Sequence, residues 1–381
     1  MWNGATPGFS MTEWSWQLTD STFKPLGDIL NFREAKLTLP LNKVNTASFN
    51  IRLDNPLAVS MISDLGYLKI YRNKVLLFYG PLITVAEVGA GDNATIQVNA
   101  SGPEWIFTQR LRGRQASGIK TLGANARSAK FIEHLASANA EGETHIDYTT
   151  GPISGGSTAI YESTPYRTLA EVLDDMSNTA EGFDWDIIPQ ENYINGLVVS
   201  QKIGRIIIAN EINVEQANAV FEWGVGRNNI ASFTRTVDRT TLANRAYNFT
   251  AAGPEAAGAP TVSAENASSI STYGLQEALV TANILNTTLR QALVNENIEV
   301  RKNPRQTIVF QPSTNVAPNA LTGVSPVPSV GVDYKIGDSV RVRIVQKEVI
   351  HFDAMVRVWG AEYALDENFK ETQTLTLSNT S

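Results

Sequence analysis

The chain has 381 residues, no cysteine and a formal net charge of −7 at pH 7. The lack of cysteine excludes disulfide scaffolds, cysteine-ligated zinc and cysteine nucleophiles. The acidic balance argues against general affinity for the nucleic-acid backbone, which requires clustered cations. The length predicts two or three domains with real cores. The N-terminus lacks a basic start followed by an apolar core, so we expect no signal peptide, and the apolar runs are too short for a membrane segment.

Residues 1–27 are expected to form an N-terminal arm or a lead-in strand. They carry three tryptophans, Trp2, Trp14 and Trp16, which is unusual for an arm. Tryptophan is enriched where proteins bind partners. These side chains therefore either pack back on the core or anchor a protein partner, and the sequence leaves both roles open.

Residues 28–110 are expected to form a first β-barrel-like domain. Within it, Tyr67–Ala100 contains runs in which apolar and polar residues alternate, interrupted at Arg72–Lys74 and at Gly80–Pro81. The stretch Gly89–Asn93 predicts a hairpin turn, because glycine, asparagine and aspartate tolerate positive φ. Alternation of period two between such turns predicts an antiparallel meander with one buried face.

Three arginines, Arg110, Arg112 and Arg114, alternate at the end of this domain. They are the sharpest local cluster of charge in an acidic chain. The cluster either contacts nucleic acid or an acidic partner, or it is a solvated strand end, which we favour. Together with the three tryptophans, these arginines are the candidate partner-interface residues.

Residues 111–225 change period and are expected to form a small α+β insertion domain. Asn125–Ala136 has helical spacing, and Thr164–Pro165 offers a capping hydroxyl and a first-turn proline. The apolar residues of Leu169–Met176 then form one stripe of a helix. Phe183–Ile187 and part of the following chain alternate as strands do.

Residues 226–381 are expected to form a second β-barrel-like domain with a long helix. Ala251–Ser269 reads as a mobile loop, and the leucines between Leu275 and Leu293 indicate a long amphipathic helix. Gln311–Asp333 is a second long loop. From Tyr334 to Leu377 the order is again glycine, strand, turn, strand, turn, strand, which suggests an internal duplication.

Candidate chemistry is sparse. The three histidines, His134, His145 and His351, are scattered, and His145 with Asp147 lacks the further ligands that a metal site requires. The acidic pairs Asp174–Asp175 and Asp184–Asp186 are candidates for glycan hydrolysis. Asp174 and Asp175 point in different directions on a helix, and Asp184 with Asp186 fits the solvated face of a strand.

No phosphate-binding loop, nucleophile elbow or zinc-protease motif is present in the sequence. We therefore expect no catalytic, cofactor-binding or metal site, and no enzymatic activity. The fold class predicted from the residues is α+β, mainly β: two barrel-like antiparallel β-domains with an inserted small α+β domain.

Six stretches of the chain resemble a family of phage proteins, the tail-tip hubs, or minor tail proteins, of long-tailed siphophages that infect actinobacteria. These hubs are related to the baseplate hub proteins of tailed phages. The resemblance covers most of the chain past residue 28, and its motifs are strand-and-turn patterns. The stretches that carry it are Gly66–Tyr71, Leu77–Ile83, Ser101–Trp105, Thr168–Pro189, Ser271–Asn303 and Tyr334–Ile344.

The resemblance implies a homotrimer in the virion, at the distal end of the phage tail. Each chain of such a hub supplies two barrel-like domains, so three chains build a pseudo-sixfold ring that adapts the sixfold tail tube to a threefold tip. It implies a distal tail protein, a tape measure protein and other tail-tip proteins as partners. Viral DNA would pass through the channel without sequence-specific binding.

Two rival functions stay open at the level of sequence. A receptor- or glycan-binding tail protein would use the tryptophans or the long loops. A cell-wall hydrolase would need two convergent carboxylates in a cleft, and we expect none.

Overall fold

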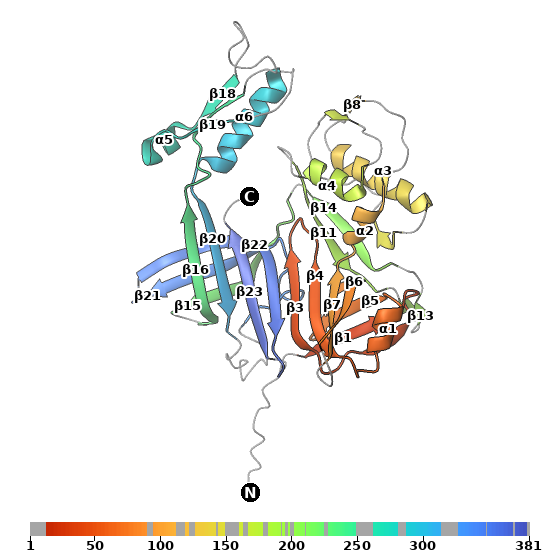
Figure 1. Cartoon of the computed structure of the whole chain (residues 1–381). Helices are drawn as coiled ribbons and strands as arrows, with labels where there is room; N and C mark the ends of the chain where they lie inside the picture. The colour runs from red at the N-terminus through yellow and green to blue at the C-terminus, as the bar shows by residue number, and fades with distance from the viewer. Residues whose placement is uncertain are drawn as a thin grey trace.

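The computed structural model shows a mainly-β α+β protein (Figure 1). One antiparallel-dominated sheet of 13 strands forms its body, and smaller sheets with helices lie beside it. The structure describes residues 13–89, 94–111, 119–121, 126–141, 144–148, 160–162, 167–177, 182–191, 193–194, 197–198, 202–209, 211–224, 228–248, 262–280, 287–313, 327–347, 349–368 and 370–378.

The first part of the large sheet, here called the first β unit, is wholly antiparallel. Its spatial order is β3–β4–β7–β6–β5–β1–β2. A short helix, α1 (Ala58–Ser63), connects β4 to β5. The strands are β1 (Trp14–Thr19), β2 (Pro25–Asp28), β3 (Arg33–Pro40), β4 (Thr46–Arg52), β5 (Tyr67–Arg72), β6 (Val75–Val88) and β7 (Thr95–Ser101).

The predicted meander is confirmed in β5, β6 and β7, with one difference. Gly80–Pro81 does not end a strand, because β6 runs on to Val88. A Cβ on Gly80 would lie 1.9 Å from the carbonyl oxygen of Ser101. The glycine therefore permits a close approach of two backbones within the sheet, and it does not mark a turn.

The other part of the sheet, the second β unit, has the order β16–β20–β23–β22–β21–β15. All its pairs are antiparallel except β15 with β21. Its strands are β15 (Glu215–Trp223), β16 (Ile230–Asp238), β20 (Arg305–Pro312), β21 (Ser339–Gln346), β22 (Val349–Leu365) and β23 (Glu371–Ser378).

The two β units have the same strand order. When β2 is left out, each unit has six strands in the sheet. If these are numbered 1 to 6 along the chain, their order across the sheet is 2-3-6-5-4-1 in both units. The two units differ in the direction of one strand pair only: β1 runs antiparallel to β5, whereas β15 runs parallel to β21. The ladder pairs of the described residues leave each unit open, since β1 does not pair with β3 nor β15 with β16.

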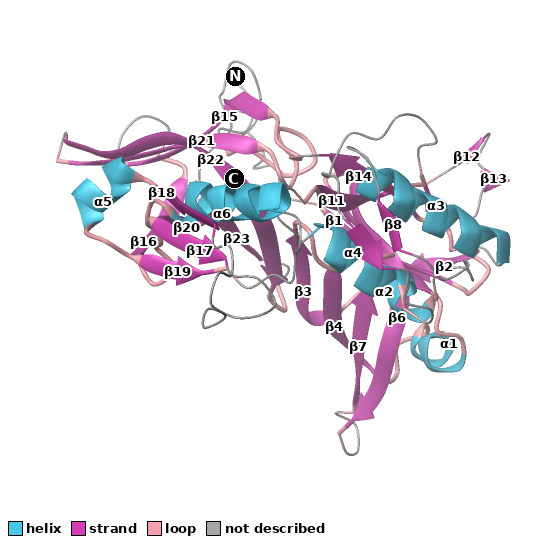
Figure 2. Ribbon diagram, turned by 90° about the horizontal axis from the view of Figure 1, so that it is seen from above, coloured by secondary structure: helices cyan, strands magenta, loops and turns pink. Residues whose placement is uncertain are grey.

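The insertion carries a separate core. Its sheet, β11–β14–β9, packs against helices α2, α3 and α4, which gather on one side in Figure 2. Its elements are α2 (Trp105–Gln109), β8 (Ile119–Thr121), α3 (Ala126–Glu141), β9 (Ile146–Asp147), β10 (Ile160–Glu162), α4 (Leu169–Ser177), β11 (Asp184–Pro189), β12 (Tyr193–Ile194), β13 (Leu197–Val198) and β14 (Gly204–Ala209).

The helix predicted over Asn125–Ala136 is confirmed as α3. Helix α4 begins later than Thr164–Pro165 suggests, and those two residues lie outside the described ones. The backbone N–H of Glu171 donates to the Thr168 hydroxyl at 3.2 Å, and the Glu171 carboxylate accepts from the Thr168 N–H at 2.8 Å. This capping box places the helix start at Leu169.

An outer module lies at the end of β16 and β20 (Figure 1). Here two predictions were wrong. Leu279 lies in a strand, so the helix predicted from Leu275 begins only at Thr287, and the predicted loop Ala251–Ser269 contains β18 and the start of α5. Asn266 caps α5 by accepting from the Ser269 N–H at 2.9 Å. The elements are β17 (Arg245–Asn248), β18 (Val262–Glu265), α5 (Ala267–Tyr273), β19 (Glu277–Leu279) and α6 (Thr287–Arg301).

Candidate functional site

The predicted partner-interface tryptophans belong to the sheet. Trp16 is 1% exposed and packs against Phe32 and Phe49, with ring centroids 5.0 and 5.5 Å away. Packing on the core therefore accounts for Trp16, which has no surface to offer a partner. Trp14 is half-buried, and both lie in β1, which pairs with β5 over its whole length. Residues 14–19 are thus a lead-in strand and not an arm, and Trp2 lies outside the described residues.

Arg110 faces inward. Its guanidinium donates to the carbonyl of Ala138 in α3 at 2.6 Å, and its own carbonyl accepts from the Leu169 N–H at 2.8 Å. The residue therefore ties the start of the insertion to α3 and α4. Arg112 and Arg114 lie outside the described residues, so their role as partner contacts stays a prediction.

The acidic pairs do not converge on a cleft. Asp184 is 8% exposed, which corrects its assignment to a solvated face. Its carboxylate accepts from the Asn42 side chain at 2.7 Å and from the Ile212 N–H at 2.9 Å, and it forms an ion pair with Arg357. Asp175 forms an ion pair with Arg167. These carboxylates are engaged in structural contacts.

The histidine–aspartate pair is also engaged. Asp147 accepts two hydrogen bonds from the Arg205 guanidinium at 2.9 and 3.0 Å, and the His145 ring lies 4.9 Å from that of Phe23. Among the residues that the structure describes, no three acidic or histidine side chains gather as metal ligands do. None of the described helices has the length and apolar character needed to cross a bilayer.

The two β units meet through a strand pair from opposite ends of the chain. β3 pairs antiparallel with β22, from Pro40 opposite Gly360 to Ala35 opposite Leu365. Lys36 forms an ion pair with Glu362 at 3.0 Å across this pair. The large hydrophobic core runs through both units without interruption.

A buried charge cluster reinforces this junction. The Arg72 guanidinium donates two hydrogen bonds of 2.9 Å to the Glu371 carboxylate, and both side chains are largely buried. The Trp14 indole donates to the same carboxylate at 2.9 Å, and its ring stands edge-on to Tyr363 at 5.3 Å. Arg72 and Trp14 come from the first β unit, whereas Glu371 and Tyr363 come from the second. Sequence reasoning missed Arg72 and Glu371, since neither stands in a motif.

Two cavities lie where the parts meet. One, of about 180 Å³, is lined by the first β unit, by β11 and by residues 330–336, with Asp186 and Lys335 among its walls. Burial raises the pKa of Asp186 to about 6, against the opposing influence of Lys335. Burial also raises the pKa of Glu104 well above its usual range, and the charge of Asp186 adds to this. Asp186 and Glu104 therefore both have raised pKa values and keep their protons to a higher pH than exposed acids do.

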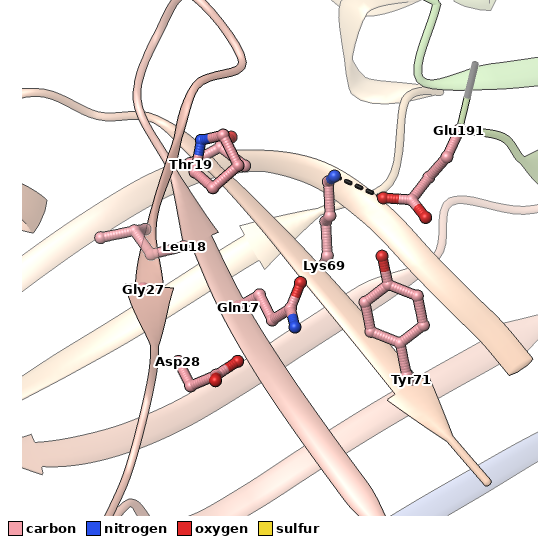
Figure 3. A pocket seen from close by; sticks show the side chains of 9 residues that line it. Gln17, Leu18, Thr19, Gly27, Asp28, Lys69, Tyr71 and Glu191 are labelled. Carbon is pink, nitrogen blue, oxygen red and sulfur yellow. Dashed lines mark hydrogen bonds and ion pairs between the residues drawn. The ribbon is translucent and has the colours of Figure 1, made fainter. Parts of the chain in front are cut away.

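The other cavity, of about 330 Å³, is polar and open to the surface (Figure 3). Lys69, which is 3% exposed, points from β5 into an ion pair with Glu191. Gln17, Asp28 and Tyr71 add an amide, a carboxylate and a phenol to the walls. The cavity can therefore hold a small polar group.

Several strands of the large sheet have an edge without a partner among the described residues, and β16 and β6 are two of them. β16 pairs only with β20, and most of its side chains are exposed. The outer half of β6, residues 83–88, pairs with β7 alone and carries half-buried and exposed side chains. Figure 2 shows this half of β6 projecting with β7 away from the body of the protein. Open edges of this kind are available for pairing with another chain.

Comparison with known proteins shows what this fold is similar to. Neither a protein-family model nor a curated protein matches the sequence. Among solved structures, the 43 kDa tail protein of prophage MuSo2 from Shewanella oneidensis is similar with a TM-score of 0.60 and 8% identity, over 96% of this chain and 98% of that chain.

Two further prophage or bacterial tail proteins share the fold. The tail protein from Neisseria meningitidis MC58 has a TM-score of 0.57 and 10% identity, over 96% of both chains. Prophage tail protein gp18 from Listeria monocytogenes EGD-e has a TM-score of 0.56 and 9% identity, over 96% of this chain and 94% of that chain. At these identities the likeness shows a shared fold along nearly the whole chain.

Proposed function

We propose that this chain is a structural component of a phage tail, the trimeric hub at the tail tip or baseplate. The observation that carries the proposal is the pair of β units with one strand order, in a fold shared over 96% of the chain with a prophage tail protein. We take the two units to be an internal duplication that forms two barrel-like domains.

A matching β-bulge supports the duplication. In β6 the register against β7 shifts between Leu82 and Thr84, and in β22 the register against β23 shifts between Val358 and Gly360. Both bulges fall where the long strand passes from its inner to its outer half. Bulges tend to persist within related structures, because they set the local bend of a sheet.

Three copies of a chain with two equivalent units supply six units around an axis. A closed ring of this kind converts threefold symmetry into approximate sixfold symmetry, on which a tube of hexamers stacks. The neighbours we propose are a distal tail protein, the tape measure protein and other tip proteins of a siphophage infecting an actinobacterium. The net charge of −7 suits a channel for viral DNA, because like charge avoids adhesion to phosphates.

We propose no enzymatic activity for this chain. One acid of each pair that the hydrolase alternative requires is held in an ion pair, Asp184 with Arg357 and Asp175 with Arg167. Retaining and inverting glycosidases both need two carboxyl groups free to face one sugar. Incubation of the purified chain with host cell wall is expected to release no soluble fragments.

The polar cavity around Lys69 and Tyr71 favours the alternative of a glycan-binding tail protein. Its amide, carboxylates and aromatic side chain are groups that hold sugars. Binding of host glycans that Tyr71→Ala abolishes would support this second function.

Imaging of assembled tails tests the hub. We expect this chain in three copies around the tail axis at the tip, seen directly in a reconstruction of the particle. A peripheral fibre, or a copy number other than three around the axis, contradicts the proposal. Monomers of the isolated chain do not, because neighbouring proteins can be required for assembly.

A further inference from the structure

The junction inside one chain shows how one β unit binds the next. Arg357 of β22 faces both Ser339 of β21 and Ser378 of β23, so β21 and β23 lie on opposite edges of β22. The outer half of β22, residues 360–365, faces β23 on one edge and β3 on the other. β22 therefore presents one edge first to β21 of its own unit and then to β3 of the other unit.

The first β unit has the same arrangement, except that no strand of the described residues lies beside β6 where β3 lies beside β22. Its long strand β6 presents one edge to β5 along Val75–Pro81 and faces β7 along Leu82–Val88. No strand of the described residues occupies the β5-side edge beyond Pro81. The counterpart of β3, which is β16, likewise has one edge without a strand among the described residues.

The exposure of the side chains agrees with these two open strand edges. Ala35, Leu37 and Leu39 of β3 are buried at the internal junction. On β16, by contrast, Val237 is 52% exposed, and Thr84 and Glu87 on the outer half of β6 are exposed as well. The residues that are buried at the internal junction thus have half-buried or exposed counterparts on the two open edges.

The ladders fix the correspondence residue by residue. In the first unit a row across the sheet runs Thr38, Thr46, Ser101, and in the second a row runs Thr236, Thr307, Ser378. The two rows have the same residue types in the same order. The bulges align Leu82 with Val358 and Thr84 with Gly360. At the internal junction Leu39 faces Ala361 and Leu37 faces Tyr363.

We propose that β16 of one chain pairs antiparallel with the outer half of β6 of the next chain, as β3 pairs with β22 within a chain. The register carried over places Val237 opposite Val85 and Arg235 opposite Glu87. The occupant of each open edge is a second copy of this chain. This inference rests on the proposed ring and names the strands that close it.

The side chains on the two edges are complementary in this register. Val237 and Val85 are β-branched apolar residues, a favourable cross-strand pair. Arg235 and Glu87 are both exposed in the single chain and have opposite charge, whereas like charges directly opposite would weaken the pair. The opposite charges and the valine pair therefore both fit this register. The register itself follows from the β3–β22 pair, the matching rows and the bulges alone.

Disulfide trapping tests the pairing, and the absence of cysteine from the chain gives a clean background. The full chain with Val85→Cys and Val237→Cys is oxidised at the highest concentration at which it stays soluble. We expect covalent dimers and trimers under denaturing, non-reducing conditions. The matched control combines Val237→Cys with Ala86→Cys, whose side chain points to the other face of β6, and is expected to remain monomeric.

Charge reversal is the second arm. Arg235→Glu or Glu87→Arg alone is expected to weaken association of the chains roughly tenfold, and the double variant is expected to restore it. The folding of each variant is checked by its circular dichroism spectrum and melting midpoint.

The outcomes separate this inference from the hub itself. A threefold ring of the Val85→Cys, Val237→Cys variant that forms without a disulfide between the two substituted positions overturns the strand pairing and leaves the hub standing. Equal cross-linking in the control pair, or the absence of the cross-link from assembled tails that carry the Val85→Cys, Val237→Cys chain, also contradicts the pairing. The hub is then decided by imaging of the tail.

Discussion

Replacement of Asp184 by asparagine is expected to loosen the attachment of the insertion to the sheet. Asp184 lies on β11, Arg357 on β22, and Asn42 in the turn between β3 and β4, so one carboxylate joins the insertion to both β units. The side chains of Arg357 and Asp184 are 5% and 11% exposed. Asparagine keeps the shape of the side chain but removes the charge that balances Arg357.

The expected loss follows from what Arg357 retains. Breaking a buried ion pair by removing one partner costs about 3–5 kcal/mol, because a charge is left without compensation. Here Arg357 still donates to the carbonyls of Gly337 and Ile212 at 3.1 and 2.9 Å, and its guanidinium lies 4.7 Å from the Trp359 ring. Glu211 also stands 3.9 Å away. We therefore expect a loss at the lower end, about 3 kcal/mol.

Urea unfolding followed by circular dichroism measures this loss, and limited proteolysis shows whether the insertion opens first. Glu362→Gln, which removes the exposed ion pair with Lys36, is the control and is expected to cost at most about 0.5 kcal/mol. The double variant Asp184→Asn with Arg357→Met is expected to recover part of the stability. A loss below about 1 kcal/mol for Asp184→Asn would refute the reasoning, because the pair would then bear no buried charge.

Two further variants test other junctions. The folded pKa of Asp186, about 6 against 3.8 when exposed, means that its contribution to stability is fully present below about pH 4 and is lost as the pH rises through 6. Asp186→Asn is therefore expected to raise stability at pH 8 by up to about 3 kcal/mol and to leave it unchanged at pH 4. Thermal melts of both proteins at the two pH values show this; equal gains at both would contradict it. Gly80→Ala places a methyl group 1.9 Å from the Ser101 carbonyl oxygen, so we expect a loss of about 3 kcal/mol in urea unfolding. A Gly80→Ala variant as stable as the wild type would contradict this, because the backbones at Gly80 and Ser101 would then move apart at no cost.

The strands of the β units were largely predictable because each alternates over several residues beside clear turns. The meander from Tyr67 to Ser101 and the strands after Tyr334 follow this pattern. Gly80–Pro81 misled because the same residue types serve a turn and a close backbone approach. The outer module was predicted poorly, since β18 and β19 are only four and three residues long. Such short strands carry no periodic signal and depend on neighbours distant in sequence.

The charged contacts at the junctions were beyond sequence reasoning for a different reason. Asp184 alternates with apolar residues, as a solvated carboxylate on an amphipathic strand does, but Asn42, Ile212 and Arg357, all distant in sequence, surround its side chain. Arg72 and Glu371 stand at strand ends where charge is common. Their pairing is set by the tertiary arrangement of two units, which no local pattern contains.

The pairing of β3 with β22 has a consequence for how the chain is made. β3 (Arg33–Pro40) leaves the ribosome long before β22 (Val349–Leu365) is synthesised, so the edge of β3 stays unpaired in the meantime. Contacts between such distant segments slow folding, and unpaired strand edges aggregate. Chains that stop before β22 would expose this edge and would lack the core residues that β22 and β23 supply. Only a chain that includes β22 can therefore cover the edge of β3, which gives assembly a built-in preference for subunits in which this pair has formed.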